Sequence, residues 1–311
     1  MTPNKTIVFL FIGMCIILSA CSPASSNPSN PLVVASTTLI GDVVQQVGGD
    51  LITLHVLLPL NSDPHSFSAA PKDVAMIEAA QLVFMNGLDL EESLIDLITA
   101  NASGKVVPVS NGVETILLGE DHHPEEEDHD SDDSQAAPDP HVWMDPANVQ
   151  IWTEAVAREL STLDPEHASV YRQNADQYQA ELEELDGWIR AQIEQLPSEQ
   201  RVLVTDHDTL GYFAQAYGFE VIGVVVVGGS TLSDPSAQQI AALEETIMAF
   251  NTPAIFVDTS VNPQVSERIA ADTGTALVKL YTGSLSEPDG PAATYIDLMR
   301  YTVTSIVKAL K

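Results

Sequence analysis

The feature that most constrains the fold is an alternation of short apolar runs with helix-like stretches, which occurs on both sides of a long helical segment. The apolar runs, predicted as strands, lie at 32–38, 51–59, 82–87, 105–110, 201–205, 219–227, 254–259 and 275–282. The helix-like stretches lie at 40–48, 73–81, 90–101, 210–218 and 235–250, with one more ending near Asp272 and one starting at Thr294. This order is typical of mainly parallel sheets covered by helices.

The segment between the two halves is predicted to be one long helix. After the start signal Asp164-Pro165, apolar residues recur three and four positions apart from Tyr171 to Leu196. A helix of about 32 residues would be roughly 48 Å long. We therefore expect an α/β protein in which two similar βα lobes are joined by one long rigid helix, with a cleft between the lobes. The expected division is 32–150 for the N-terminal lobe, 151–197 for the helical segment and 198–311 for the C-terminal lobe.

The N-terminus resembles an export signal. Lys5 precedes an apolar run that is too short to span a membrane comfortably. The run ends in LSAC, which resembles a bacterial lipobox, and a Ser/Pro/Asn-rich stretch follows. These features predict a signal peptide at 1–20, a lipid on Cys21 and a flexible tether at 21–31. We expect an extracytoplasmic protein that is lipid-anchored to the bacterial cell membrane; an ordinary export signal with an incidental cysteine is the alternative.

Composition excludes two kinds of chemistry. The 44 acidic and 12 basic residues give a formal charge of −32, so a nucleic acid would be repelled. Cys15 lies in the predicted signal peptide and Cys21 would carry the lipid, which leaves the mature chain without a disulfide or a thiolate ligand. Any transition-metal site must therefore use histidine and carboxylate side chains.

Three histidines lie where strands are expected to give way to loops or helices: His65, His141 and His207. Ligands collect at the strand ends of parallel α/β lobes, so these residues are candidate ligands. A single loop histidine is more often solvated or packed than functional, but His65 and His141 both follow Asp-Pro, a stiff dipeptide. The three histidines together therefore indicate a site.

The remaining histidines have simpler interpretations. His122, His123 and His129 belong to an acidic insertion at 119–138, with ten Asp or Glu residues from Glu120 to Asp139. Such a run is expected to be disordered, either as a solvated segment or as a weak metal-collecting loop. His55 is expected within a strand, and His167 on the surface at the first turn of the long helix.

Three aspartates near the candidate ligands have predicted structural roles. Asp145 before Pro146 is typical of a helix N-cap. Asp206 and Asp208 flank His207, and they either orient its imidazole or cap a helix.

The segment at 60–92, LNSDPHSFSAAPKDVAMIEAAQLVFMNGLDLEE, resembles the signature of solute-binding receptors for zinc and manganese ABC importers, the cluster A-I family. In that family the histidine after Asp-Pro is the first metal ligand, which implies His65. The second ligand lies in a motif matched by HVWMDP, which implies His141. The third lies in a Thr-X-His motif followed by Tyr-Phe, which implies His207.

The resemblance runs from Leu32 to Leu310 and has one departure. The family usually places an aspartate where this chain has Gly283, in Gly-Ser-Leu. The fourth ligand is therefore open among Glu287, Asp289 and a water molecule.

The resemblance implies a receptor that captures a divalent transition metal between its lobes and delivers it to an ABC importer permease. A monomer is expected. Three imidazoles favour Zn²⁺ over Ca²⁺ or Mg²⁺, and the missing aspartate disfavours Mn²⁺, which prefers more carboxylate oxygens. The alternatives are a manganese receptor, an adhesin of the same fold and, from another class, a zinc hydrolase. Because imidazoles must be neutral to bind metal, affinity is expected to fall below about pH 6.5.

Overall fold

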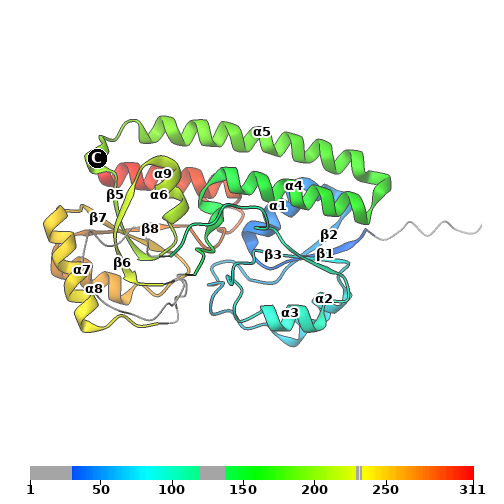
Figure 1. Cartoon of the computed structure of the whole chain (residues 1–311), viewed down its shortest axis with the longest axis horizontal. Helices are drawn as coiled ribbons and strands as arrows, with labels where there is room; N and C mark the ends of the chain where they lie inside the picture. The colour runs from blue at the N-terminus through cyan, green and yellow to red at the C-terminus, as the bar shows by residue number, and fades with distance from the viewer. Residues whose placement is uncertain (1–29, 119–136, 229–230, 232) are drawn as a thin grey trace, which may run out of the picture.

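The computed structural model describes residues 30–118, 137–228, 231 and 233–311, and this part of the chain forms two α/β lobes (Figure 1). The N-terminal lobe contains β1 (Leu32–Ala35), β2 (Thr53–Val56), β3 (Leu82–Met85) and β4 (Lys105–Pro108), in the order β2-β1-β3-β4. The C-terminal lobe contains β5 (Val202–His207), β6 (Glu220–Val226), β7 (Ala254–Asp258) and β8 (Ala276–Leu280), in the order β6-β5-β7-β8. Every strand pairing is parallel, so the prediction of two similar parallel-sheet lobes is confirmed.

Helices cover both faces of each sheet because strand side chains alternate between the faces. In β1, Val33 and Ala35 belong to a different core cluster from Val34. The helices of the N-terminal half are α1 (Thr38–Gly48), α2 (Pro71–Ala79), α3 (Ile95–Asn101) and α4 (Pro146–Leu163). Those of the C-terminal half are α6 (Gly211–Tyr217), α7 (Ala237–Phe250), α8 (Gln264–Thr273) and α9 (Tyr295–Leu310).

The long helix α5 (Ala168–Ile193) runs along both lobes in Figure 1. Its 26 residues are fewer than the sequence periodicity predicts, because a short 3₁₀ turn at Pro165–His167 precedes it and the α-helix ends before Pro197. His167 is the N-cap residue of α5, and its Nδ1 lies 2.7 Å from Asp164 Oδ2.

Helix α4 begins as the sequence predicts. Asp145 is its N-cap, and its side chain accepts a hydrogen bond of 2.9 Å from the backbone N–H of Ala147, while Pro146 occupies the first turn. The helix starts before residue 150, so the expected boundary of the N-terminal lobe falls inside α4.

One hydrophobic core joins the two lobes. It contains residues of both sheets, such as Val33 and Phe256, and residues of the helical layer, such as Leu185 of α5 and Leu298 of α9. Two smaller clusters lie on the opposite faces of the sheets, under α2 and α3 and under α7 and α8. Moving the lobes apart would expose the shared core, so a wide hinge motion would be costly.

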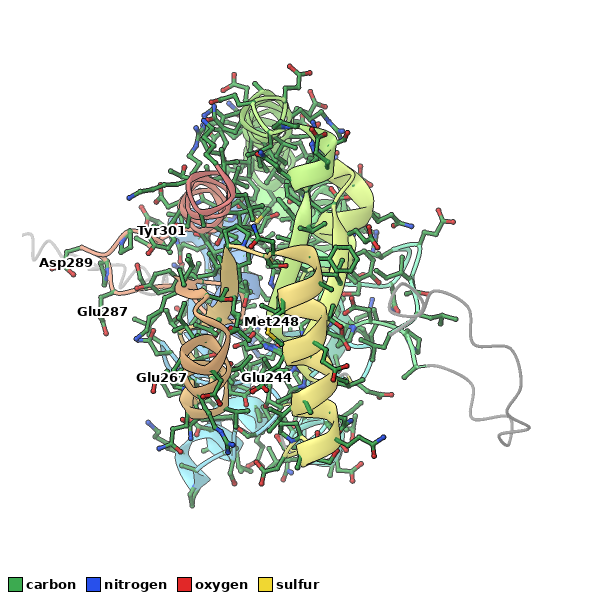
Figure 2. All side chains as sticks on the ribbon, turned by 90° about the vertical axis from the view of Figure 1, so that its left-hand side faces the viewer. Glu244, Met248, Glu267, Glu287, Asp289 and Tyr301 are labelled. Carbon is green, nitrogen blue, oxygen red and sulfur yellow. The ribbon has the colours of Figure 1, made fainter. Side chains whose placement is uncertain are left out.

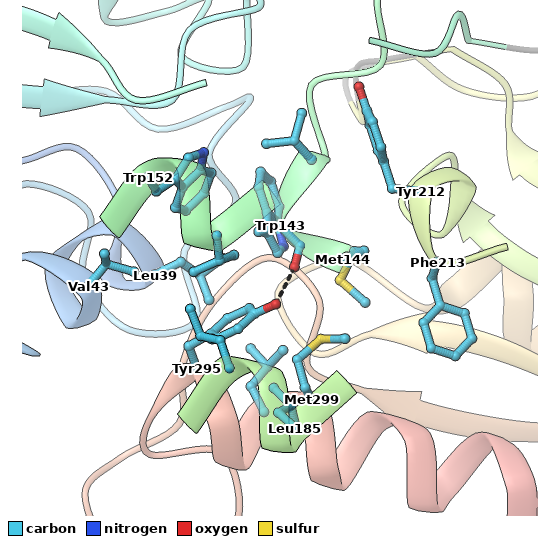
Figure 3. Close-up of a cluster of buried hydrophobic side chains, with 14 of the residues drawn as sticks. Leu39, Val43, Trp143, Met144, Trp152, Leu185, Tyr212, Phe213, Tyr295 and Met299 are labelled. Carbon is cyan, nitrogen blue, oxygen red and sulfur yellow. Dashed lines mark hydrogen bonds between the residues drawn. The ribbon is translucent and has the colours of Figure 1, made fainter. Parts of the chain in front are cut away.

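Hydrogen bonds reinforce this shared core (Figure 3). The Tyr295 hydroxyl donates to the Trp143 carbonyl over 2.7 Å, and the Trp143 indole donates to the Thr282 carbonyl over 2.6 Å. The Asp42 carboxylate of α1 accepts the backbone N–H of Tyr295 at the start of α9 over 2.9 Å. These three hydrogen bonds therefore join residues of the first half of the chain to residues of the second half.

The predicted signal peptide at 1–20, Cys21 and nearly all of the tether lie outside the described residues. Within the described residues, no helix combines the length and the apolar character that crossing a membrane requires.

Candidate metal centre

The three predicted ligands come from two loops and one strand end. His65 follows β2, His141 precedes the short 3₁₀ helix Val142–Met144, and His207 is the last residue of β5. All three are buried, with exposed fractions of 2%, 1% and 4%. One ring nitrogen of each lies within 4.8 Å of those of the other two. The fold thus brings together three imidazoles that are far apart in the sequence.

The separation of the first two ligand nitrogens suits a small tetrahedral ion. His65 Nε2 and His141 Nε2 are 3.2 Å apart. Two nitrogens bound to tetrahedral zinc at about 2.0–2.1 Å would be roughly 3.3 Å apart. The first two ligands are therefore already at a separation that a bound zinc ion would require.

The two Asp-Pro-His triplets fold in the same way. The backbone N–H of His65 donates to Asp63 Oδ1 over 3.0 Å, and that of His141 donates to Asp139 Oδ1 over 2.8 Å. In both cases the aspartate binds the backbone two residues on, in an Asx turn, and the intervening proline restricts the backbone. The triplet therefore fixes the backbone of each histidine through local hydrogen bonds.

Two aspartates orient the imidazoles. Asp139 Oδ1 lies 2.7 Å from His141 Nδ1, and Asp206 Oδ1 lies 2.9 Å from His207 Nδ1. A proton on each Nδ1 would leave Nε2 as the metal-binding atom. Asp206 therefore orients the imidazole, as one of the two predicted alternatives, whereas Asp208 accepts the backbone N–H of Gly228 over 3.1 Å.

Asp139 has a role that the sequence interpretation missed. The available signal was the repeated Asp-Pro-His triplet, in which the aspartate is close enough to reach both the backbone and the ring of its histidine.

The charges around the site set the protonation of two ligands. Burial, together with the neighbouring His141 and His207, lowers the pKa of His65 to about 3. Burial also disfavours the charged form of His207, but the charge and hydrogen bond of Asp206, with the charges of Asp258 and Asp63, raise its pKa to about 9. Before metal binds, His207 is thus protonated at neutral pH and His65 is neutral. Metal affinity is therefore expected to depend on pH well above 6.5, the value expected from the sequence.

Gly283 lies beside the site, between the two lobes. A Cβ atom at this position would be 3.8 Å from Pro64 Cδ, 3.8 Å from Asp258 Oδ1 and 3.4 Å from Ser260 Oγ. Pro64 immediately precedes the ligand His65. A side chain at position 283 would therefore have room for its first carbon and would begin next to the residue that precedes His65.

The two carboxylates suggested as fourth ligands lie elsewhere. Glu287 and Asp289 are exposed, and Figure 2 shows them at the outer edge of the molecule. Neither belongs to the group formed by the three imidazole nitrogens.

The accessory histidines His122, His123 and His129 lie outside the described residues. The ends of the insertion are described and are paired: the backbone N–H of Leu118 donates to the Ala137 carbonyl over 3.0 Å, and Leu117 forms an antiparallel bridge with Pro138. The insertion thus starts and ends at one place, next to Asp139.

Replacing residues 120–136 by a short Gly-Ser linker is expected to leave one tightly bound ion and to remove weaker additional binding. The paired ends can be bridged by a short turn, and neither His141 nor Asp139 is altered. Calorimetric zinc titration of the variant and the full chain tests this. Loss of the tight site in a folded variant would contradict the division between His141 and the accessory histidines.

Comparison with known families places this geometry in context. A family profile described as "ZnuA: Zinc-uptake complex component A periplasmic" matches residues 33–309. The manganese-binding lipoprotein MntA of Halalkalibacterium halodurans is 30% identical over 313 residues, covering 98% of this chain and 99% of MntA. The manganese ABC transporter substrate-binding lipoprotein PsaA of Streptococcus pneumoniae is 27% identical over 316 residues, covering 98% of each chain.

Solved structures show the same fold. The periplasmic zinc binding protein TroA from Treponema pallidum superimposes with a TM-score of 0.80 at 30% identity, covering 91% of this chain and 99% of TroA. A manganese-bound periplasmic metal binding protein from Candidatus Liberibacter asiaticus gives a TM-score of 0.77 at 29% identity, covering 90% of this chain and 100% of that one. The similar proteins thus include some named for zinc and some for manganese.

Proposed function

The chain belongs to the ZnuA family of zinc-uptake complex component A proteins, and from this membership we propose that it is the extracytoplasmic receptor of an ABC importer for a divalent transition metal. We propose further that this metal is Zn²⁺. The observation that carries the proposal is the group formed by His65, His141 and His207, whose ligand nitrogens lie within 4.8 Å of one another. In the proposed cycle the protein is held at the membrane by a lipid on Cys21, binds the ion between its lobes and passes it to a permease.

The case for zinc rests on the donor atoms, because relatives named for manganese and structures named for zinc are both similar to this chain. The group comprises three imidazoles and no carboxylate. Zinc accepts three neutral nitrogens and a water molecule in a tetrahedron, whereas manganese favours carboxylate oxygens. With Glu287 and Asp289 exposed, water is the proposed fourth ligand.

The burial of the ligands supports capture rather than catalysis. None of the three histidines is more than 4% exposed, so a substrate larger than an ion would need a rearrangement to reach the metal. A zinc hydrolase requires access for substrate as well as a position for water. The shared core favours release through loop motions and modest tilting of the lobes.

Metal content and paired titrations test the proposal. Protein purified without added metal is expected to contain zinc in elemental analysis, and competition titrations with chelators are expected to give tighter binding of Zn²⁺ than of Mn²⁺. Manganese binding as tight as zinc binding would contradict the selectivity but not the receptor function. Absence of tight binding of either ion would contradict both, and turnover of model esters or peptides by the zinc-loaded protein would favour the hydrolase.

Gly283→Asp is expected to raise the affinity for Mn²⁺ relative to Zn²⁺ by roughly tenfold or more, because a carboxylate oxygen would replace a neutral water. The position has room for a Cβ atom and lies next to Pro64. Glu287→Ala and Asp289→Ala are matched controls, since both side chains are exposed on the same segment and should leave both affinities unchanged. An unchanged metal preference in Gly283→Asp, or a large loss in either control, would show that the fourth position is assigned wrongly.

A further inference from the structure

Asp258 is a buried carboxylate at the end of β7 that no metal-ligand motif includes. It is 3% exposed. Its Oδ1 accepts the backbone N–H of Ser260 over 2.6 Å and also the Ser260 hydroxyl. Its Oδ2 accepts the backbone N–H groups of Thr282 and Gly283 over 2.7 and 2.8 Å, and also the Thr282 hydroxyl. Both oxygens therefore accept hydrogen bonds from neighbouring backbone N–H and hydroxyl groups. This is typical of a residue that positions a loop rather than of a metal ligand.

The backbone of Asp258 connects this carboxylate to the third ligand. Its N–H donates to Asp206 Oδ2 over 2.8 Å, while Asp206 Oδ1 lies 2.9 Å from His207 Nδ1. One residue thus supports His207 through its main chain and the segment at 282–283 through its side chain. A change of the side chain alone would disturb the segment and leave the hydrogen bond to Asp206 available.

The same segment is held from the other half of the chain by Trp143. The Trp143 ring packs edge-on against His141, with ring centroids 5.4 Å apart and an interplanar angle of 70°. Its indole N–H donates to the Thr282 carbonyl over 2.6 Å. Thr282 is therefore fixed on one side by a residue that contacts the second ligand, and on the other by a residue that supports the third.

We propose that Asp258 is a positioning residue of the metal site, which fixes the segment Thr282–Gly283 against the three histidines and so sets the shape of the fourth coordination position. This inference rests on the proposed metal-binding function. Gly283 supplies no ligand side chain, so its backbone forms part of the wall beside the ion. The wall keeps its place because three hydrogen bonds from Thr282 and Gly283 converge on Oδ2 of Asp258, while two from Ser260 fix its Oδ1.

Asp258→Asn tests this role. An amide has one acceptor oxygen and an NH₂ group, so donors on one side of the present carboxylate would face another donor. Zinc affinity is expected to fall about 10- to 100-fold, as is typical when a group that supports metal ligands is removed. The absorption spectrum of bound Co²⁺, which reports coordination geometry, is expected to change as well.

Asp42→Asn is the matched control. Asp42 is a partly buried carboxylate that also joins the two halves of the chain, because it accepts the backbone N–H of Tyr295. It also accepts a hydrogen bond from the Gln46 side chain, so these partners lie on α1 and α9 rather than in the metal loops. Thermal melts of both variants report any loss of stability. If the role of Asp258 were merely structural, Asp258→Asn would behave like Asp42→Asn. Its melting temperature would fall and its Co²⁺ spectrum would not change.

Thr282→Val keeps the test decisive if Asp258→Asn does not fold. It removes one of the five donors and preserves the shape of the side chain, and a smaller loss of zinc affinity with an altered Co²⁺ spectrum is expected. Native zinc affinity and a native Co²⁺ spectrum in the folded variants would overturn the inference while the receptor function stood. Failure of the unmodified protein to bind zinc or cobalt would instead overturn the proposed function itself.

Discussion

Replacing His65, His141 or His207 by alanine is expected to weaken zinc binding by roughly a thousandfold or more in each case. Each substitution removes one of three imidazole nitrogens that lie within 4.8 Å of one another. Among the described residues, no carboxylate belongs to this group. The remaining two nitrogens and water would form a much weaker site.

Calorimetric titration with zinc and a competing chelator measures these losses, and circular dichroism melts check folding. His55→Ala is a suitable control, because His55 lies in β2 of the same lobe as His65, is partly exposed and is not in the group. Its affinity should equal that of the unmodified protein. Near-native affinity in any of the three ligand variants would remove that residue from the site.

Zinc affinity is expected to rise about tenfold per pH unit between pH 6 and pH 8, or about a hundredfold over the range. The raised pKa of His207, about 9, means that metal binding must displace a proton from its imidazole throughout this range. The rise should level off only above the pKa, where His207 is already neutral. His65, with a pKa lowered to about 3, adds no pH dependence here.

Calorimetry in buffers of different ionisation enthalpy counts the protons released. About one proton per ion is expected from His207 at pH 7, and Asp206→Asn should reduce this release because it removes the largest favourable charge on the imidazolium. An affinity that does not change between pH 6 and pH 8 would contradict the protonation of His207 before binding.

The residues of the site that are readable from the sequence are those held by local chemistry. The Asp-Pro-His triplets at 63–65 and 139–141 fix their histidines through bonds two residues apart, and the strand ending at His207 is marked by its apolar run. The two sheets were predictable for the same reason, since apolar runs and helix signals are local. That these three segments lie close together could be inferred because ligands bind at the carboxyl ends of the strands in parallel α/β sheets.

The supporting residues could not be predicted because their partners are distant in the sequence. Asp258 binds Thr282 and Gly283, and only the parallel pairing of β7 with β8 brings them together. The acidic residues Glu287 and Asp289, close to Gly283 in the sequence, are carried to the surface.

The start of α3 illustrates a second limit. The predicted helix at 90–101 begins only at Ile95, because Glu91 is buried and accepts the backbone N–H groups of Asn86 and Gly87. These bonds hold a turn in which Gly87, Leu88 and Asp89 all have positive φ, of 83°, 54° and 60°. A side chain that turns inward to support a loop leaves no periodic signal in the sequence.

The core that continues from one lobe into the other also determines how the free energy of metal binding is distributed. Neither lobe encloses its own share of that core, since Val33 of one sheet and Phe256 of the other belong to a cluster completed by α5 and α9. The lobes should therefore unfold together as one cooperative unit. An ion that binds only the folded state stabilises that whole unit in proportion to the logarithm of its free concentration. Metal supply would then set the resistance of the entire chain to unfolding and proteolysis, including helices far from the three histidines.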